Sequence, residues 1–303
     1  MTLPISGRTA LVGVLGDPVR HSLSPAMHNA ALAELGLDWA YLALPAPAED
    51  LATVVRGLEA MGCRGLSVTI PHKQAVASLC RELSPLAERI GAVNTLVPLE
   101  GGGWLGTNTD WEGFIAPLLH GQWRGRRALV LGCGGSARAV VAGLVELGLG
   151  SIQVAARRPE ALAAFASSCG AWAPQLEPLA WSALAGGDWG SAADSPLAQV
   201  DLVVNTTPLG MASASDPAAA LACPLEPAQL DQLPASATVY DLIYTPRPTQ
   251  LLRQAAARGC AIQDGLAMLV HQGAAALKLW SGLDTVPTQV MHAAVEAALA
   301  AKA

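Results

Sequence analysis

A short apolar run leads into a glycine-rich turn in the stretch ALVLGCGGSA, residues 128–137. Ala128–Leu131 has the length of a buried strand, and a helix-like segment, Ala137–Leu147, follows the turn. A strand, a G-x-G-x-x-G/A turn and a helix in this order are typical of the dinucleotide-binding turn of a Rossmann fold, with Ala137 at the third small position. The stretch therefore predicts a Rossmann-type domain with a dinucleotide cofactor.

The residues of this turn are the first candidate cofactor ligands. We expect Gly132 to permit the tight turn and Gly134 to let the backbone approach a pyrophosphate. The N-terminus of the following helix would present free N–H groups and a partial positive charge to that anion. The candidate residues of the turn are Gly132, Cys133, Gly134, Gly135, Ser136 and Ala137.

The segment after the next strand indicates which dinucleotide binds. An NAD site normally carries Asp or Glu about 20 residues beyond the turn, where it holds the ribose 2′-hydroxyl. Residues 152–159 read IQVAARRP, with no acid and with the adjacent Arg157 and Arg158. Guanidinium groups bind a 2′-phosphate through paired hydrogen bonds, whereas a carboxylate would repel it. We therefore expect NADP; two solvated arginines at a strand end are the alternative interpretation.

Strand-like and helix-like runs alternate along most of the chain, as in α/β folds with parallel sheets. The glycine turn at residues 101–103 predicts a hairpin between 92–98 and 104–107, and two helices over 266–280 and 287–300 close the chain. Residues 174–195 are rich in Ala, Gly, Pro and Trp, and we expect them to form only surface connections.

Composition excludes several classes of protein. Charged residues make up 14% of the 303 residues and hydrophobic residues 52%, which rules out a disordered chain. The sequence contains no run of about 18 apolar residues, the length that would predict a membrane span. The net charge of −6, without a large basic cluster, argues against a nucleic-acid partner. The first residues lack the basic segment and apolar core of a secretion signal, so we expect a cytoplasmic protein. The six cysteines contain no CxxC pair, and we expect neither a metal nor a disulfide framework.

Three polar clusters lie before residue 111, and packing alone does not readily explain them. Residues 21–28 read HSLSPAMH, where Ser22 and Ser24 could bind a substrate carboxylate. The alternative is that Ser24 caps a helix whose first residue is Pro25. The second cluster is SVTIPHK, residues 67–73, at the end of a strand, and the third is GAVNT (91–95) with GTNTD (106–110). Taken singly, each could be turn chemistry.

Taken together, these motifs closely resemble the shikimate dehydrogenase family. The resemblance covers most of the chain and continues beyond the glycine-rich turn in family order. Its later motifs are NTTPLGM (205–211), YDLIYTP (240–246) and DGLAMLVHQ (264–272).

The resemblance implies an N-terminal α/β substrate domain, residues 1–112, and a Rossmann-type NADP-binding domain, residues 113–263. The C-terminal helices, residues 264–303, would return to the first domain. It also implies reversible NADPH-dependent reduction of 3-dehydroshikimate to shikimate, in the shikimate pathway that leads through chorismate to the aromatic amino acids.

The resemblance also assigns substrate and cofactor residues. Ser22 and Ser24, with Tyr244, would bind the substrate carboxylate. The ring hydroxyls would contact Thr69, Lys73, Asn94, Asp110 and Gln272. Arg157, Arg158, Leu242 and Gly265 would line the cofactor site together with the turn at 132–137. Two departures matter: Ser67 stands where family members often have Asn, which would make that contact shorter or water-mediated, and Ala156-Arg157-Arg158 replaces the usual Asn-Arg-Thr.

We assign proton transfer to Lys73 and Asp110, either to Lys73 alone or to the coupled pair, with His72 and His28 as alternatives. The competing functions are a quinate/shikimate dehydrogenase with broader cofactor use and a non-catalytic regulatory relative. The expected partners are the small-molecule substrate and cofactor, and the sequence leaves a homodimer open.

Overall fold

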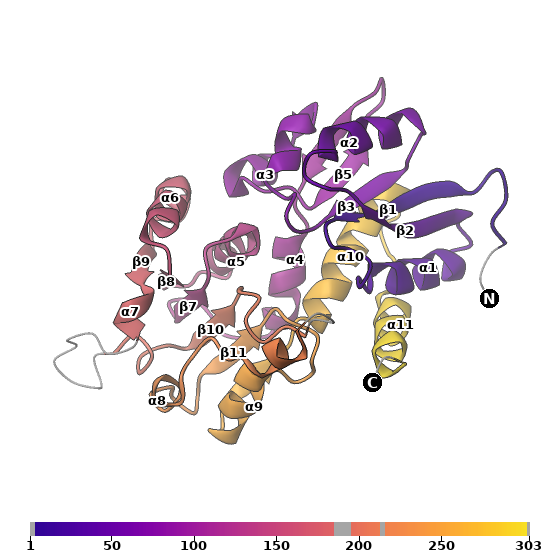
Figure 1. Ribbon diagram of the computed structural model, residues 1–303. Coiled ribbons are helices and arrows are strands. Elements are labelled where there is room, and N and C mark those ends of the chain that lie inside the picture. The colour runs from indigo at the N-terminus through magenta and orange to yellow at the C-terminus, as the bar shows by residue number, and fades with distance from the viewer. Residues whose placement is uncertain (1–3, 185–194, 213–215, 302–303) are drawn as a thin grey trace. The chain divides into compact units, whose positions relative to one another are not determined.

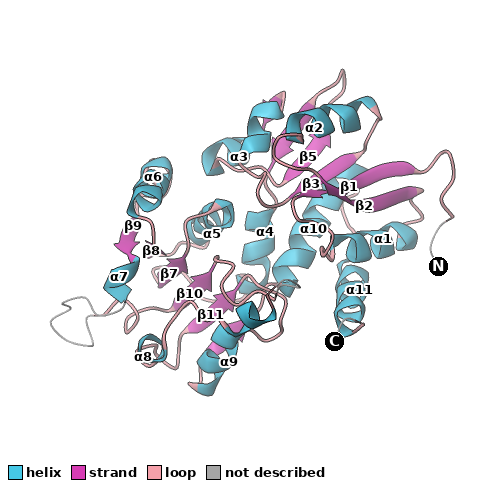
Figure 2. Ribbon diagram, in the orientation of Figure 1, coloured by secondary structure: helices cyan, strands magenta, loops and turns pink. Residues whose placement is uncertain are grey.

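The computed structural model describes residues 4–184, 195–212 and 216–301. These residues form two compact units, Met1–Phe114 with Leu269–Ala303 and Ile115–Met268. Each unit contains its own six-stranded sheet, and helices accompany both sheets (Figures 1 and 2). The α/β fold expected from the sequence is confirmed. This division into units does not test the domain limits expected at residues 112 and 263, which stay a prediction.

The sheet of the first unit is mixed. It has the strand order β2-β1-β3-β5-β6-β4. Its strands are β1 (Ala10–Gly16), β2 (Trp39–Pro45), β3 (Gly65–Val68), β4 (Glu82–Leu83), β5 (Thr95–Pro98) and β6 (Trp104–Thr107). β1 is parallel to β2 and β3, but β5 is antiparallel to both β3 and β6. The expectation of parallel sheets is therefore wrong for this unit. The reason is the predicted hairpin, because a short glycine turn can only return the chain antiparallel.

Helices cover both faces of this sheet (Figure 1). The helices of this unit are α1 (Ser24–Glu34), α2 (Leu51–Ala60), α3 (Pro85–Ile90), α10 (Leu266–Ser281) and α11 (Thr288–Ala300), which packs on α1, and α4 (Asp110–Ile115) begins in this unit. On one face, Leu51 and Val55 of α2 share a core cluster with Leu66 and Val68 of β3. On the other, a Cβ added at Gly65 would overlap the indole of Trp280 on α10. The C-terminal helices thus pack on the first unit, as expected.

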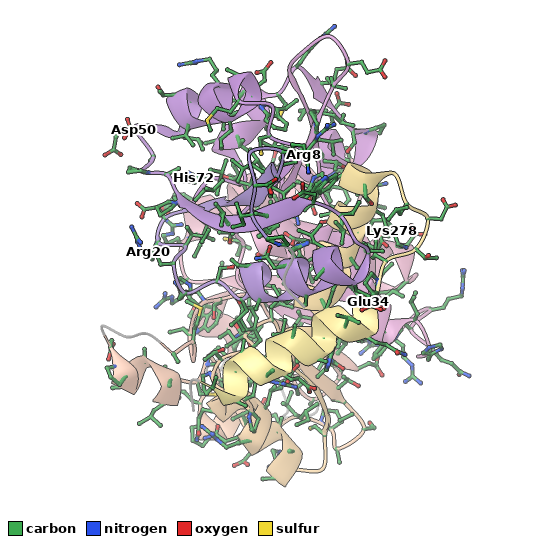
Figure 3. All side chains as sticks on the ribbon, turned by 90° about the vertical axis from the view of Figure 1, so that its right-hand side faces the viewer. Arg8, Arg20, Glu34, Asp50, His72 and Lys278 are labelled. Atoms are coloured by element: carbon green, nitrogen blue, oxygen red, sulfur yellow. The ribbon has the colours of Figure 1, made fainter. Side chains whose placement is uncertain are left out.

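Charged side chains of the first unit lie mainly at its surface. Arg20, Glu34 and Asp50 are exposed (Figure 3). Within the described ranges, no helix has both the length and the apolar character that a membrane crossing requires.

The sheet of the second unit is parallel throughout. Its strand order, β12-β11-β10-β7-β8-β9, is that of a Rossmann fold. The strands are β7 (Arg127–Leu131), β8 (Ser151–Ala156), β9 (Leu176–Ala180), β10 (Leu202–Asn205), β11 (Thr238–Asp241) and β12 (Ala261–Gln263). The helices are α5 (Gly135–Glu146), α6 (Pro159–Cys169), α7 (Trp181–Leu184), α8 (Pro227–Leu230) and α9 (Gln250–Ala257). The order reverses between β7 and β10, where such folds bind their ligands.

The assignment of residues 174–195 to surface connections is wrong for its first part. Leu176–Ala180 forms β9, which pairs with β8 from Ile152↔Leu176 to Ala156↔Ala180. β9 is an edge strand with Pro178 in its middle and mostly exposed side chains, so it lacks the apolar alternation of a strand. Residues 185–194 lie outside the described ranges.

Candidate functional site

Lys73 and Asp110 form an ion pair in the first unit. Lys73 follows β3 and Asp110 begins α4, and the distance from Lys73 Nζ to Asp110 Oδ2 is 2.5 Å. Their side chains are 14% and 7% exposed, so the pair is shielded from water without being enclosed. A cation and a carboxylate in this setting can hold, donate and accept a proton at one place.

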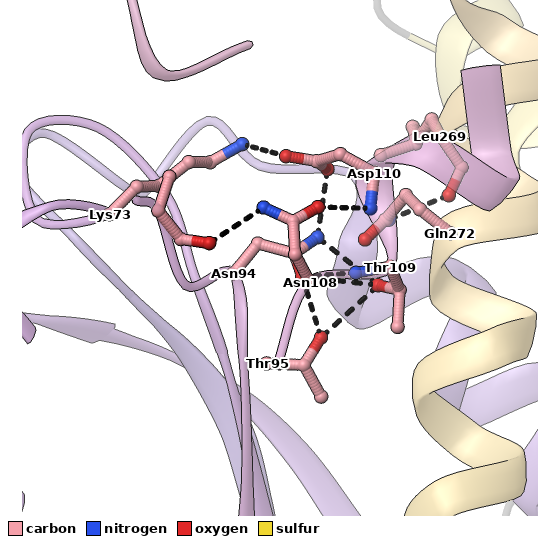
Figure 4. Close-up of polar contacts among 9 residues, drawn as sticks. Lys73, Asn94, Thr95, Asn108, Thr109, Asp110, Leu269 and Gln272 are labelled. Carbon is pink, nitrogen blue, oxygen red and sulfur yellow. Dashed lines mark hydrogen bonds and ion pairs between the residues drawn. The ribbon is translucent and has the colours of Figure 1, made fainter. Parts of the chain in front are cut away.

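Asn94 holds the carboxylate of Asp110 in its orientation (Figure 4). Its amide nitrogen donates to Asp110 Oδ1 at 2.8 Å and to Thr109 Oγ1 at 3.1 Å. Its amide oxygen accepts from the backbone N–H of Thr109 at 2.7 Å and from the hydroxyl of Thr95 at 2.9 Å. A flip of this amide would set its oxygen against Asp110 Oδ1 and its nitrogen against the N–H of Thr109, so it would break both of those bonds. Asp110 Oδ1 is therefore occupied, and Oδ2 faces Lys73.

Backbone contacts fix the same group of residues. The carbonyl of Lys73 accepts from the N–H of Val93 at 2.7 Å. The side chain of Asn108 donates to the carbonyl of Ala92 at 2.9 Å and accepts from the N–H of Asp110 at 3.0 Å. The motifs 67–73, 91–95 and 106–110 thus meet at one edge of the sheet.

The two histidines weighed as alternative bases have other contacts. His72 is buried, and its Nε2 lies 2.6 Å from the carbonyl of Ala46. His28 is fully buried on α1 and stacks on Tyr41, and burial lowers the pKa of its imidazole to about 3. These contacts favour Lys73 and Asp110 as the acid–base groups.

The serines of the first cluster lie at the start of α1, but Ser24 does not cap it. The N-cap residue is Leu23, without a side-chain cap hydrogen bond, and Ser24 is already helical. Instead, the hydroxyl of Ser22 accepts from the N–H of Ser24 at 3.2 Å. The helix-cap interpretation of Ser24 is therefore wrong, because the helix begins one residue earlier than it requires.

Further residues of the predicted substrate site belong to the same unit. Ser67 is buried on β3. Thr69 follows that strand and packs against Gly16, since a Cβ added at Gly16 would overlap the Thr69 methyl group. Gln272 lies on α10, where its amide donates to the carbonyl of Leu269 at 2.7 Å (Figure 4).

The second unit has a pocket of about 580 Å³ at the C-terminal ends of its central strands. It brings together Gly132, Cys133, Gly134, Arg157 and Arg158 from the predicted cofactor residues. Sequence reasoning did not assign its other lining residues, which are Ala156, Trp181, Thr206, Thr207 and Pro208. The signal for Thr206–Pro208 was available, since the NTTPLGM motif directly follows a strand of the predicted sheet.

The glycine turn has the geometry that a pyrophosphate requires. Gly132 has φ +105°, and a Cβ there would lie 2.6 Å from Thr206 Oγ1. A Cβ at Gly134 would meet open space, so a ligand can approach the backbone. α5 begins at Gly135, two residues earlier than expected, and no side chain caps it. Its first N–H groups are thus available to an anion.

Two arginines and a tryptophan line the other end of the pocket. Arg157 and Arg158 are exposed just beyond β8, and the pocket lining includes neither Asp nor Glu. Burial raises the pKa of the Cys133 thiol, while the charge of Arg158 lowers it, so Arg158 lies near the turn. The pairing Ala156↔Ala180 places Trp181 next to Arg157 at the end of the sheet. These residues fit a dinucleotide with a 2′-phosphate.

A buried polar network supports the loop opposite Gly132. Asn205 donates to Asp241 Oδ1 at 3.0 Å, and its own oxygen accepts from the N–H and the hydroxyl of Thr207. Asp241 Oδ2 also accepts from the hydroxyl of Thr249 at 2.7 Å. Burial raises the pKa of Asp241 to about 6, against these hydrogen bonds, which lower it.

Leu242, Gly265 and Tyr244 also lie in the second unit. A Cβ added at Gly265 would overlap the carbonyl of Leu242, so only glycine allows this close approach. Burial raises the pKa of the Tyr244 phenol. Its role at the substrate carboxylate stays a prediction.

The fold and the pocket define a protein with a Rossmann dinucleotide-binding unit and a second unit in which the Lys73–Asp110 ion pair lies at the end of a mixed sheet. Residues 14–96 match the "Shikimate dehydrogenase substrate binding domain", and residues 265–296 match the "Shikimate 5'-dehydrogenase C-terminal domain". A shikimate dehydrogenase (NADP(+)) of Synechococcus sp. strain JA-3-3Ab is 51% identical over 98% of this chain and 96% of its own length. The chain belongs to the shikimate dehydrogenase family.

Two solved structures are similar over nearly their whole length. Shikimate 5-dehydrogenase from Thermus thermophilus, in complex with NADP(H) and shikimate, has a TM-score of 0.80 and 37% identity, over 96% of this chain and 100% of that one. Quinate dehydrogenase from Corynebacterium glutamicum, in complex with NAD, has a TM-score of 0.81 and 29% identity, over 95% of this chain and 99% of that one.

Proposed function

We propose that this protein is an NADP-dependent shikimate dehydrogenase, which reduces 3-dehydroshikimate to shikimate and catalyses the reverse oxidation. The observation that carries the acid–base half of this proposal is the ion pair of Lys73 and Asp110, with Asp110 oriented by Asn94. A secondary alcohol can be oxidised only if a proton leaves its oxygen as hydride leaves its carbon.

The chemistry that the bound cofactor contributes is acceptance or donation of that hydride. The turn at Gly132 and Gly134, with the start of α5, would hold its pyrophosphate. Arg157 and Arg158 would bind its 2′-phosphate through charge-assisted hydrogen bonds, which is the reason to prefer NADP over NAD.

The residues of the first unit would hold the substrate and move its proton. In the direction of reduction, Lys73 as an ammonium would polarise the carbonyl oxygen and donate a proton to it. In oxidation, the proton would pass to Lys73 alone or to the Lys73–Asp110 pair. Asn94, Asp110, Thr69 and Gln272 would bind ring hydroxyls, and Ser22 and Ser24 the carboxylate, with Tyr244.

A spectrophotometric assay with four combinations tests the proposal: shikimate or quinate, each with NADP or NAD. Reduction of NADP in the presence of shikimate is expected to be the fastest reaction. Equal or higher kcat/KM with quinate and NAD would instead identify a quinate dehydrogenase. No turnover of either substrate, in a protein that still binds shikimate, would identify a non-catalytic relative.

We further propose that the enzyme works in the cytoplasm and has neither a membrane partner nor a nucleic-acid partner; its net charge of −6 supports the last of these points. Fractionation of cells tests the first two points, and gel-shift measurements with DNA and RNA test the third. Light scattering on the purified protein distinguishes a homodimer from a monomer.

A further inference from the structure

The side chain of Tyr41 lies near Ser67 and Ser24, two serines of the predicted substrate site. Tyr41 is on β2 and is fully buried. Val12 of β1 pairs with both Tyr41 and Gly65, and two residues further along β1 Val14 pairs with Ser67. Because side chains two residues apart share a face of a sheet, Tyr41 and Ser67 lie on the same face, with one strand between them.

The first helix brings Ser24 to this place. Ser24 and His28 are one turn apart on α1 and therefore lie on the same side of the helix. The His28 ring stacks on the Tyr41 ring at 4.1 Å between centroids and 8° between planes. The indole of Trp280 lies 6.1 Å from the Tyr41 ring. This aromatic cluster of His28, Tyr41 and Trp280 fixes the direction of the phenol.

The hydroxyl of Tyr41 has no hydrogen-bond partner of good geometry among the described residues, although it is buried. Burial raises the pKa of Tyr41, and hydrogen bonding to the side chains of Ser67 and Ser24 lowers it. The phenol oxygen thus lies near both serine hydroxyls. A buried polar group without a partner lowers stability, and each such group in a folded protein calls for an explanation.

We propose that Tyr41 is a positioning residue for the substrate carboxylate, with its phenol donating a hydrogen bond to Ser24 when substrate is bound. A serine hydroxyl has a single proton. When its oxygen accepts from Tyr41, that proton is directed away from the phenol and toward the carboxylate. This inference rests on the proposed function.

The test is Tyr41→Phe, which preserves the ring, its volume and its stacking and removes only the hydroxyl. KM for shikimate should rise about 3- to 10-fold, the effect of one neutral hydrogen bond, while kcat and KM for NADP stay the same. With the analogue of shikimate that has hydrogen in place of the carboxylate, KM should be equal for wild type and variant, since Ser24 then has no acceptor to bind. Tyr41→Phe combined with Ser24→Ala should be no worse than Ser24→Ala alone, because Tyr41 acts through Ser24.

The alternatives give different results. A lowered melting temperature with equal losses for shikimate and for the analogue without a carboxylate would make Tyr41 a purely structural residue. An unchanged KM for shikimate would also overturn the inference. Leu42→Ala, an exposed position on the same strand, is the matched control and should change none of these quantities. Calorimetric titration with shikimate applies the same test without turnover, so a wild-type protein that fails to oxidise shikimate would refute the proposed reaction separately.

Discussion

Replacement of Lys73 by Met tests the acid–base assignment most directly. Methionine keeps the length and volume of the alkyl chain and removes only the ammonium. Loss of a positioned acid or base should lower kcat by about 10²- to 10⁴-fold. KM for shikimate should rise much less, because the other polar groups of the site still hold the ring.

The structure also limits the expected loss of stability. Removing one member of a buried ion pair costs about 3–5 kcal/mol when the remaining charge has no partner. Asp110 keeps its 2.8 Å hydrogen bond from Asn94, and the pair is not enclosed. We therefore expect about 1–3 kcal/mol, seen as a melting temperature lower by a few degrees. Lys278→Met, on α10 outside the network (Figure 3), is the matched control, with kcat and KM unchanged.

Asp110→Asn then separates Lys73 alone from the coupled pair. Its amide oxygen can still accept from Asn94, but its amide nitrogen would face the ammonium of Lys73. If the pair acts as a unit, each single variant loses about as much kcat as the double variant; independent roles give losses that multiply. A Lys73→Met enzyme with unchanged kcat and a raised KM would refute the catalytic assignment.

Three other measurements test the second unit. Arg157→Ala should raise KM for NADP about 10- to 100-fold with little effect on NAD, and equal losses would contradict the 2′-phosphate role. Trp181→Leu should weaken NADPH binding about 3- to 10-fold if the indole stacks on the adenine; calorimetry giving an unchanged Kd would exclude that contact. Burial raises the pKa of Asp241 to about 6 in the folded protein, whereas the unfolded chain has the usual pKa of 3.8. Its contribution to stability therefore falls as the pH rises through this window, so wild type should lose up to about 3 kcal/mol relative to Asp241→Asn between pH 4 and 7. A pH-independent difference in urea unfolding would contradict this.

The parts of the fold that the sequence predicts best are those buried on both sides. All residues of β10 and four of the five in β7 are buried, so these strands appear as continuous apolar runs. β9 was not predicted because an exposed edge strand needs no apolar alternation and tolerates a proline, here Pro178.

The candidate site was predictable only in part for a similar reason. The family resemblance placed Lys73 and Asp110 in one site, and the structure joins them in an ion pair although they are 37 positions apart in the sequence; their role in proton transfer stays a prediction. The four hydrogen bonds of the Asn94 amide depend on the register between β5 and β6. The position of Trp181 depends on the pairing of β8 with β9. Neither alignment can be worked out from residue spacing.

The first unit is made from two segments of the chain, with the whole second unit between them. During synthesis, the strands of its sheet emerge long before α10 and α11. Until α10 emerges, the Trp280 indole cannot cover Gly65 or pack against the rings of His28 and Tyr41. The second unit can complete its sheet first, while an apolar face of the first remains open to water and to other chains. Emergence of α10 from the ribosome therefore sets the moment at which this face of the sheet and the His28–Tyr41 stack are covered.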